Sequence, residues 1–226
     1  NAVCQVGGRG VFSFCMCPGG IIVPASTAPE ELVVNGMSLS RRDSPFANSG
    51  FVAEVKEEDL IPFQEQGVLA GLAYQASLEK MAFEAGGKTQ VAPAQRVTDF
   101  LQGKVSSTLP GSSYIPGIAP APLHALLPKA ISTRLHGALK DFNRKMKGYI
   151  TSEAIMVGVE SRTSSPVRIP RDKVTGMHPT VVGLFPSGEG AGFAGGIVSA
   201  AVDGEKSAGA VLQFLQVPGF SPSVSQ

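Results

Sequence analysis

The sequence predicts an α/β fold preceded by an α+β insertion, and three observations lead to that prediction. Residues 1–66 hold short β-type runs separated by turn residues, which indicates a β-rich segment. Residues 67–150 carry apolar residues at helical spacing, which indicates a helical segment. Residues 151–226 hold two apolar runs, a glycine-rich turn and a long helical pattern, which is typical of α/β architecture.

The first segment predicts a small sheet. Its apolar runs are short and lie between Gly, Pro, Asn and Ser residues, as strands joined by turns do. The predicted strands are residues 11–15, 21–23, 32–34 and 51–55.

The second segment predicts helices over residues 67–85 and 94–101 and a third, amphipathic helix further on. Residues 108–122 contain four prolines, so we expect an irregular loop or a lid there. We expect the third helix to end at Gly148. Its apolar face is formed by Ile131, Leu135, Leu139, Phe142 and Met146.

The third segment predicts strands over residues 153–159 and 181–185, then a glycine-rich turn and a helix over residues 192–215. A small residue recurs at every fourth position of that helix, so one face would be nearly smooth and would allow close packing. Those residues are Gly192, Gly196, Ala200, Gly204 and Ala208.

The glycine-rich turn indicates a ligand contact. The first N–H groups of a helix lack internal partners and lie at the positive end of its dipole. Bare glycine backbone lets an anionic or carbonyl-bearing ligand reach them. Glu189 could accept hydrogen bonds from two adjacent hydroxyls, whereas Asp203 is interpreted as structural or solvated. The alternative is a tight strand–helix junction without a ligand, and the segment is not the GxGxxG fingerprint itself.

Bulk composition narrows the class of protein. The 226 residues suit one large domain or two smaller ones, and a net charge of +1 argues against a nucleic acid or membrane partner. No apolar run is long enough to span a bilayer. Three cysteines and the lack of a signal-peptide pattern favour the cytoplasm, or a plastid stroma if a preceding segment is a transit peptide. The start at Asn1 suggests a fragment of a longer chain.

Two further clusters are candidates for chemistry. Cys15 and Cys17 would share one face of a strand, as half a metal site, a redox pair, a thiolate beside a cofactor, or simply packed thiols. The other potential ligands are scattered, so no metal site is predicted. Residues 160–171 are dense in serine and arginine, which could bind phosphate or carboxylate or pair with Glu160 and Asp172.

Several motifs, taken in order along the chain, resemble the C-terminal portion of a family of uncharacterised FAD-dependent dehydrogenases (FAD/NAD(P)-binding oxidoreductases). The chain departs from that pattern at Ser161, where the family has Thr. The motifs are SFCMCPGG at residues 13–20, NGMS at 35–38, RDS at 42–44, AN at 47–48, APAQ at 92–95, DF at 99–100, SRTSSPVRI at 161–169, PSGEGAGFAGGI at 186–197 and SAAVDG at 199–204.

The resemblance implies the C-terminal part of a flavoprotein of the two-dinucleotide-binding type, with a β-plus-helical second domain inserted in its FAD-binding domain. The N-terminal Rossmann unit, with GxGxxG, would lie outside this sequence. Residues 1–66 and 67–150 would be the β-rich and helical parts of the insertion, and 151–226 the last part of the FAD-binding domain. The implied FAD-binding residues are Gly188, Glu189, Gly190, Gly192, Gly195, Gly196 and Ile197, with Arg162, Ser164, Ser165, Arg168, Cys15 and Cys17 on the substrate side.

Within that set, the resemblance implies that Glu189 meets the ribityl chain. It also implies that Gly195, Gly196 and Ile197 offer backbone N–H groups to the flavin pyrimidine edge. The implied activity is dehydrogenase-type transfer of hydride or electrons through FAD to a small-molecule substrate, with NAD(P)H as a candidate electron donor. Two alternatives stay open: a truncated, non-enzymatic fragment or binding module, and a thiol redox or metal protein that uses Cys15 and Cys17.

Overall fold

The computed structural model describes residues 2–215, and this part of the chain is a mixed α/β protein with small sheets. It divides into two compact units. Unit 1 comprises the residues up to Glu65 together with Ala73–Ser161. Unit 2 comprises Gln66–Leu72 together with the residues from Arg162 onward.

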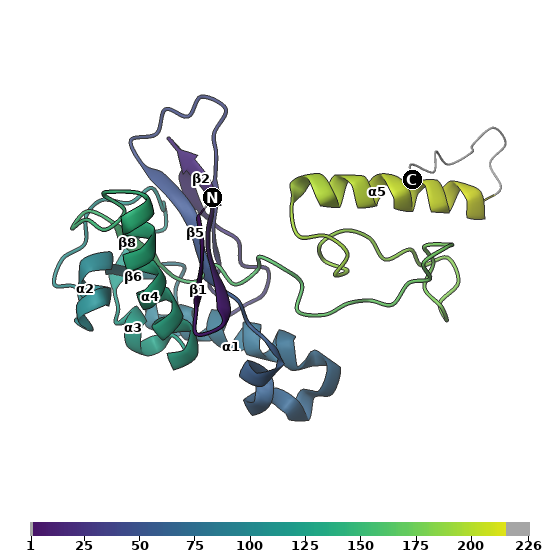
Figure 1. Ribbon diagram of the computed structural model, residues 1–226, viewed down its shortest axis with the longest axis horizontal. Coiled ribbons are helices and arrows are strands. Elements are labelled where there is room, and N and C mark those ends of the chain that lie inside the picture. Colours follow the sequence, from purple (N-terminus) through teal and green to yellow (C-terminus); the bar gives the residue numbers. More distant parts are fainter. Residues whose placement is uncertain (1, 216–226) are drawn as a thin grey trace. The chain divides into compact units, whose positions relative to one another are not determined.

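Unit 1 begins with an antiparallel sheet in the order β1-β2-β5 (Figure 1). Its strands are β1 (Ala2–Val6), β2 (Arg9–Pro18) and β5 (Ala47–Ala53), and a separate antiparallel hairpin joins β3 (Ile21–Pro24) to β4 (Val34–Met37). The turn between β1 and β2 is Gly7-Gly8, both with positive φ, as a two-residue hairpin turn requires. The predicted β-rich character of this segment is confirmed, although β1 was not predicted and the strand expected at residues 32–34 begins only at Val34.

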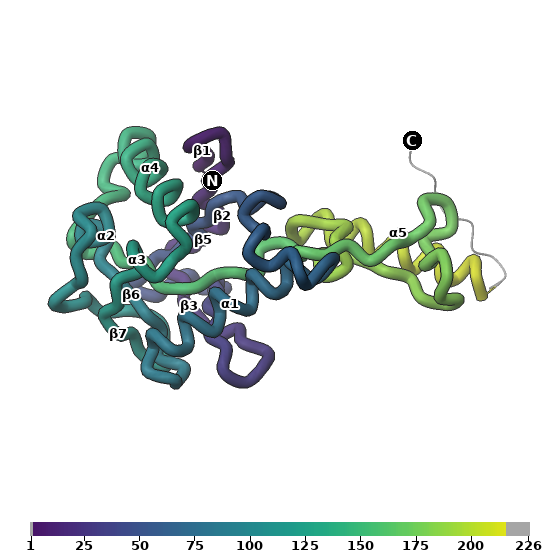
Figure 2. Tube along the Cα trace, turned by 90° about the horizontal axis from the view of Figure 1, so that it is seen from below, coloured from purple at the N-terminus to yellow at the C-terminus, as the bar shows by residue number. Residues whose placement is uncertain are grey.

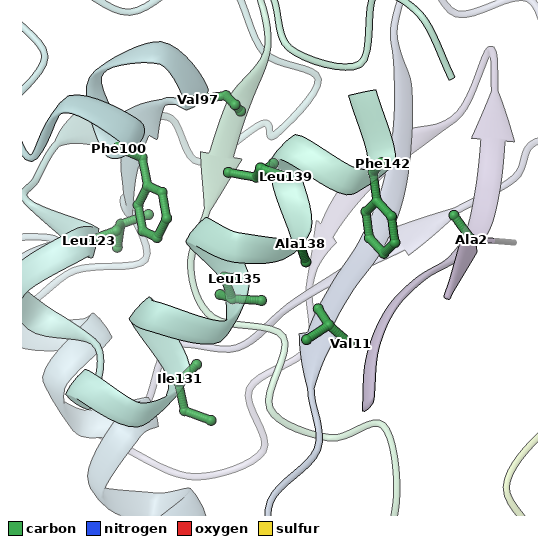
Figure 3. Close-up of a cluster of buried hydrophobic side chains, with 10 residues drawn as sticks. All are labelled: Ala2, Val11, Val97, Phe100, Leu123, Ile131, Leu135, Ala138, Leu139 and Phe142. Atoms are coloured by element: carbon green, nitrogen blue, oxygen red, sulfur yellow. The ribbon is translucent and has the colours of Figure 1, made fainter. Parts of the chain in front are cut away.

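Helix α4 (Lys129–Lys145) covers the face of this sheet (Figure 3). Its apolar residues lie at helical spacing on one side, as the sequence predicted, and they are buried against β1, β2 and β5. A Cβ at Gly137 would come within 2.9 Å of Val6, so glycine at this position lets the helix approach the strand. The core that results consists of Ala2, Val11, Val97, Phe100, Leu123, Ile131, Leu135, Ala138, Leu139 and Phe142.

The third small sheet of unit 1 has the order β7-β6-β8, and in Figure 2 its strands β6 and β7 lie close to helices α2 (Val97–Gln102) and α3 (Leu123–Leu126). Its strands are β6 (Ala92–Arg96), β7 (Ile118–Pro120) and β8 (Ile155–Val157). Residues 94–96, predicted as the start of a helix, belong to strand β6 instead. The small side chains of Ala92 and Ala94 allow β6 to lie buried between β7 and β8. Tyr114 is only 3% exposed and donates to the Gln90 carbonyl, so residues 108–122 are packed and not a free lid.

The helix predicted over residues 67–85 is shorter in the structure. A 3₁₀ segment, η1 (Glu57–Leu69), precedes α1 (Ala70–Ala85), and Gly67, with φ 54° and ψ −126°, is a kink within η1. Within unit 1, η1 is held by Asp59, which accepts from Arg9 at 2.9 Å and from Arg134 at 3.3 Å. Burial raises the pKa of Asp59, but the Lys56 N–H and the two arginines outweigh burial, so the pKa is lowered overall.

Unit 2 has little regular structure in its described part. Residues 162–196 follow an irregular path, and a single long helix, α5 (Ile197–Phe214), comes after them (Figures 1 and 2). The strand predicted over residues 181–185 is wrong, because no described strand pairs with these residues and a strand needs a ladder partner. The helix begins at Ile197 and not at 192, so only Ala200, Gly204 and Ala208 of the predicted small-residue face are helical. Among residues 2–215, no helix is both long and apolar enough to cross a membrane.

Candidate functional site

The glycine-rich segment forms a hydrogen-bonded turn. The N–H of Gly192 donates to the Glu189 carbonyl, and the N–H of Phe193 donates to the Gly188 carbonyl, both at 2.9 Å. Gly188 has φ 72° and Gly192 has φ 82°, a region that disfavours residues with a side chain. Local backbone conformation therefore accounts for two of the glycines in this turn.

Residues 165–169 run beside this turn within unit 2. The Ser165 hydroxyl donates to the Gly190 carbonyl at 3.0 Å, and the Ile169 N–H donates to the Ala191 carbonyl at 3.1 Å. A Cβ at Gly192 would lie 2.7 Å from the Val167 carbonyl oxygen, so only glycine allows this approach. Gly192, expected on a helix face, instead holds the turn against the serine- and arginine-rich segment.

Two charged side chains hold the first residues of the turn, Pro186 to Gly188. Asp203, on α5, is 8% exposed and forms a bidentate ion pair with Arg171, at 2.7 and 3.0 Å. Asp203 also accepts from the Gly188 N–H at 2.8 Å and from the Ser187 hydroxyl at 3.4 Å. Arg171 donates in addition to the Pro186 carbonyl at 2.9 Å. We refer to these two residues as the Arg171–Asp203 clamp.

The electrostatics of the clamp follow from these contacts. The Arg171 hydrogen bonds, with the Gly188 N–H, outweigh burial and lower the pKa of Asp203 to about 2. The interpretation of Asp203 as a structural residue is confirmed, and the solvated alternative is wrong. The alternative in which this segment pairs with Asp172 does not hold for Arg171, whose carboxylate partner is Asp203. Asp172 instead accepts from Thr175 and Val174 in its own turn, and the Thr175 hydrogen bonds lead the lowering of its pKa.

Two arginines meet one aromatic ring beside the turn. The guanidinium carbon of Arg171 lies 3.7 Å from the centroid of Phe193, and that of Arg168 lies 4.4 Å from it. Such contacts are attractive because the ring face is electronegative. Arg171 is already neutralised by Asp203, whereas Arg168 is exposed and makes no ion pair within residues 2–215. Arg168 is therefore oriented beside the turn with its charge available.

Other glycines of the segment have no explanation inside the described chain. Gly190, Gly195 and Gly204 do not have positive φ, and a Cβ at any of them would meet no atom within 4 Å. At Gly196, which is extended, a Cβ would meet only the Ser199 hydroxyl, at 3.8 Å. Neither conformation nor packing requires glycine at these positions, which we call the open glycine face, and each of them suits a group that approaches the backbone closely.

The open glycine face adjoins the N-terminus of α5. The N-cap residue is Gly196, which makes no side-chain capping bond, and the first helical N–H groups have no partners inside a helix. Ile197 and Val198 point into solvent, with exposures of 88% and 76%. The N–H of Gly195 is already engaged, because it donates to the Ser199 hydroxyl at 3.3 Å. The donors available at this helix end are therefore those of the first turn of α5.

The remaining predicted residues are placed as follows. Glu189 lies in the turn, half-buried, and its carboxylate makes no hydrogen bond or ion pair with residues 2–215. Arg162 and Ser164 are exposed on the segment that precedes Ser165. Ser161, the departure from the family pattern, keeps the role of a hydroxyl, since it donates to the buried carboxylate of Glu79 at 2.6 Å.

Cys15 and Cys17 lie in unit 1 and do not share a face. A bulge interrupts the pairing of β2 with β5 between Phe14 and Cys17, and Cys15 has φ 48°. Cys15 is exposed, whereas Cys17 is buried and donates its thiol hydrogen to the Cys15 carbonyl at 3.1 Å. Burial raises the pKa of the Cys17 thiol. This favours the unreactive thiol over the thiolate that nucleophiles and metal ligands require.

Sequence reasoning missed the ion pair that holds the turn. The Arg171–Asp203 clamp joins residues 32 positions apart, and no periodicity in the sequence predicts such a pair. Glu160, one residue before Ser161, lies in unit 1 close to Gly50, and burial raises the pKa of its carboxyl. No group of three or more His, Cys, Asp or Glu within the described residues could hold a metal ion.

Comparison with known proteins identifies the class to which the chain belongs. The family described as FAD-dependent protein, C-terminal domain-like, matches residues 1–163, which is most of the chain. The chain belongs to this family and is therefore a flavoprotein-related chain.

A relative extends the similarity into unit 2. An uncharacterized protein of Clostridium beijerinckii is 43% identical over 212 residues, which cover 93% of this chain and 39% of the relative. This chain thus spans about two fifths of the length of that relative.

Proposed function

We propose that this chain is the C-terminal portion of an FAD-dependent oxidoreductase of the dehydrogenase type. In this proposal unit 2 contributes one wall of the flavin site, and the Rossmann unit of a longer polypeptide contributes the rest. Unit 1 is then the inserted, substrate-side domain. Family membership and the greater length of the bacterial relative support the proposal. The observation that carries it is the open glycine face beside the uncapped start of α5.

The residues present fit a flavin at this face. The absence of side chains at Gly190, Gly195 and Gly196 leaves room for a planar ring system to contact the backbone. The first N–H groups of α5, from Ile197 onward, follow Gly195 and Gly196 directly in the chain and lie at the positive end of the helix dipole. Donors held in this way stabilise negative charge without reorganising. When bound, FAD supplies hydride and electron transfer.

Each side chain then has a defined task. Glu189, whose carboxylate has no partner within residues 2–215, accepts hydrogen bonds from the ribityl hydroxyls. Gly188 and Gly192 shape the turn that presents it, and Gly192 does so by admitting the Val167 backbone. Arg168, oriented over Phe193, faces an anionic group of the substrate. Arg162, Ser164 and Ser165 extend this substrate side.

The thiol alternative is not favoured by any observation. Cys17 is a buried thiol, and Cys15 lies in a bulge with no metal-ligand cluster around it among the described residues. Both cysteines remain substrate-side candidates in the proposal. A thiol redox centre would need the thiolate form that burial of Cys17 opposes.

The proposal is tested by flavin content. The chain is expressed together with its natural upstream coding sequence, purified gently, and examined for a bound-flavin visible spectrum. We expect stoichiometric FAD, bleached by dithionite, and bleaching by NADH or NADPH would identify the electron donor. A colourless, flavin-free protein that FAD does not reconstitute would contradict the proposal and support a non-enzymatic fragment or binding module.

A matched pair of variants locates the flavin on the open glycine face. Gly195→Val adds a side chain where a Cβ meets no atom of the described chain, so the fold should tolerate it. We expect FAD affinity to fall at least about tenfold, because the side chain occupies the space of the ligand. Gly111→Val, on the surface of unit 1 and in ordinary contact with Phe46, is the control and should leave FAD affinity unchanged. Equal affinity in both variants would place the flavin elsewhere.

A further inference from the structure

Neither of the two clusters of buried apolar side chains in the described chain supports the glycine-rich turn, because both consist of unit 1 residues. Within unit 2, Ala191 is buried in the turn itself, and the contacts that hold the backbone of residues 186–188 are polar. These contacts come from two elements that flank the turn in the sequence, the segment containing Arg171 and helix α5.

The Arg171–Asp203 clamp acts on the peptide groups of the turn itself. One carboxylate oxygen of Asp203 accepts the Gly188 N–H at 2.8 Å, and the Arg171 guanidinium donates to the Pro186 carbonyl at 2.9 Å. The ion pair between the two side chains, at 2.7 Å, ties both contacts together. Two peptide groups on either side of Ser187 are thus fixed by one charged pair.

A third contact anchors Ser187 to the same helix. Its hydroxyl donates to Asp203 at 3.4 Å and accepts from the Ser207 hydroxyl at 2.8 Å. Ser207 lies one helical turn after Asp203, so α5 holds the turn at two successive levels. Buried, charge-assisted contacts of this kind are directional and rigid, as required to hold a backbone in a defined shape.

We propose that Asp203 is a positioning residue for the cofactor: through Arg171 and the Gly188 N–H it sets the conformation of the turn that presents Glu189 and the open glycine face. This inference rests on the proposed flavin function. Asp203 does not touch the flavin in this arrangement. It acts through the backbone of residues 186–188, and loss of its charge releases both the Pro186 carbonyl and the Gly188 N–H.

The test uses the longer protein, with its upstream part, and the variant Asp203→Asn. We expect the dissociation constant for FAD to rise about ten- to hundredfold, the range that a lost charged hydrogen bond produces. We also expect the visible absorption bands and the reduction potential of the flavin that remains bound to shift, because Glu189 and the glycine face are displaced. A residue that only stabilised the fold would lower the unfolding midpoint without moving either property.

Two further variants keep the outcome clear. Glu205→Gln makes the same change from carboxylate to carboxamide on an exposed position of α5 and should leave FAD affinity within about twofold. If Asp203→Asn does not fold, Arg171→Lys keeps the charge but loses the two-pronged geometry, and FAD affinity should still fall several-fold.

The failures of the two proposals are distinguishable. Absence of flavin from the unmodified longer protein counts against the oxidoreductase function. Unmodified protein that binds FAD, together with clamp variants that bind it with unchanged affinity, spectrum and potential, overturns the positioning role of Asp203 alone.

Discussion

Units 1 and 2 differ in the kind of side chain that they bury. Unit 1 encloses two clusters of apolar side chains, one under α4 and one around Leu32, Ala82 and Tyr114. Among the described residues of unit 2, Asp203 is a buried carboxylate that is held by hydrogen bonds from Arg171, Gly188 and Ser187. Unit 2 instead exposes large apolar residues along and before α5, namely Val174, Val181, Val182, Leu184, Ile197, Val198 and Val202.

Because buried apolar side chains are clustered in unit 1 and not in the described part of unit 2, the two units are stabilised by different interactions. Burial of apolar surface stabilises unit 1 by about 25 cal/mol per Å² removed from water, and this term dominates folding. Unit 2 depends on directional polar contacts, which are worth about 1 kcal/mol each after exchange with water. Its exposed apolar residues are those expected of a surface that packs against another polypeptide segment. Three predictions probe this contrast.

The largest effect is expected in the core of unit 1. Phe142 is fully buried on α4 and makes edge-on contacts with Phe51 and Tyr149. Phe142→Ala should reduce the free energy of unfolding by about 3–5 kcal/mol, because it removes apolar burial and leaves a cavity. Urea unfolding followed by circular dichroism measures it.

The matched change in unit 2 is Phe214→Ala. Phe214 is 46% exposed and touches Phe185. Its loss should cost less than about 1 kcal/mol, since nearly half of its surface already contacts water. Equal losses for Phe142→Ala and Phe214→Ala would remove the distinction between a core-stabilised and a polar-stabilised unit.

The second effect concerns acid. The folded pKa of Asp203 is about 2, below the ordinary aspartate value of 3.8, so its stabilisation is present well above pH 4 and is lost as the pH falls toward 2. This difference in pKa corresponds to about 2 kcal/mol of stability. Hydrogen exchange of α5 amides, compared between the unmodified chain and Asp203→Asn, should show this gap at pH 6 and a closing gap below pH 4. A gap that stays constant with pH would mean that the ion pair does not stabilise unit 2.

The smallest effect concerns the exposed apolar side chains. Val198 is 76% exposed at the start of α5, so Val198→Ala should change the stability of the 226-residue chain by less than about 0.5 kcal/mol. In the longer protein the same change should cost about 1 kcal/mol or more, if the Rossmann unit covers this side chain. Thermal melts of both lengths measure the difference. Equal, negligible effects in both would show that Val198 stays exposed.

The local sequence pattern predicted secondary structure correctly where residues close together in the sequence determine it. The amphipathic face of α4 from Ile131 to Phe142 matches its burial residue by residue, because an apolar stripe at helical spacing has one way to leave water. The β-rich start of the chain and the association of the motifs with an FAD-dependent family were also predicted. The contacts within the candidate site were not predicted, because they join residues that are far apart in the sequence.

Three features show where the pattern was insufficient. Residues 181–185 have strand composition but no described partner strand, and a strand exists only in a ladder. Gly192 appeared to continue a helical stripe, whereas close approach of the Val167 backbone and a positive φ explain it. Cys15 and Cys17 alternate like residues on one strand face, but a bulge shifts the register between them.

The sequence by itself determined the class of the protein, the helical face of α4 and the location of the glycine-rich turn, because these depend on residue type and spacing alone. Only the tertiary structure decided how that turn is held. The Arg171–Asp203 clamp, the approach of residues 165–169 and the open face at Gly190 and Gly195 all depend on segments that meet in space. Hydrogen bonds and close packing act over a few ångströms, and sequence spacing does not encode such distances.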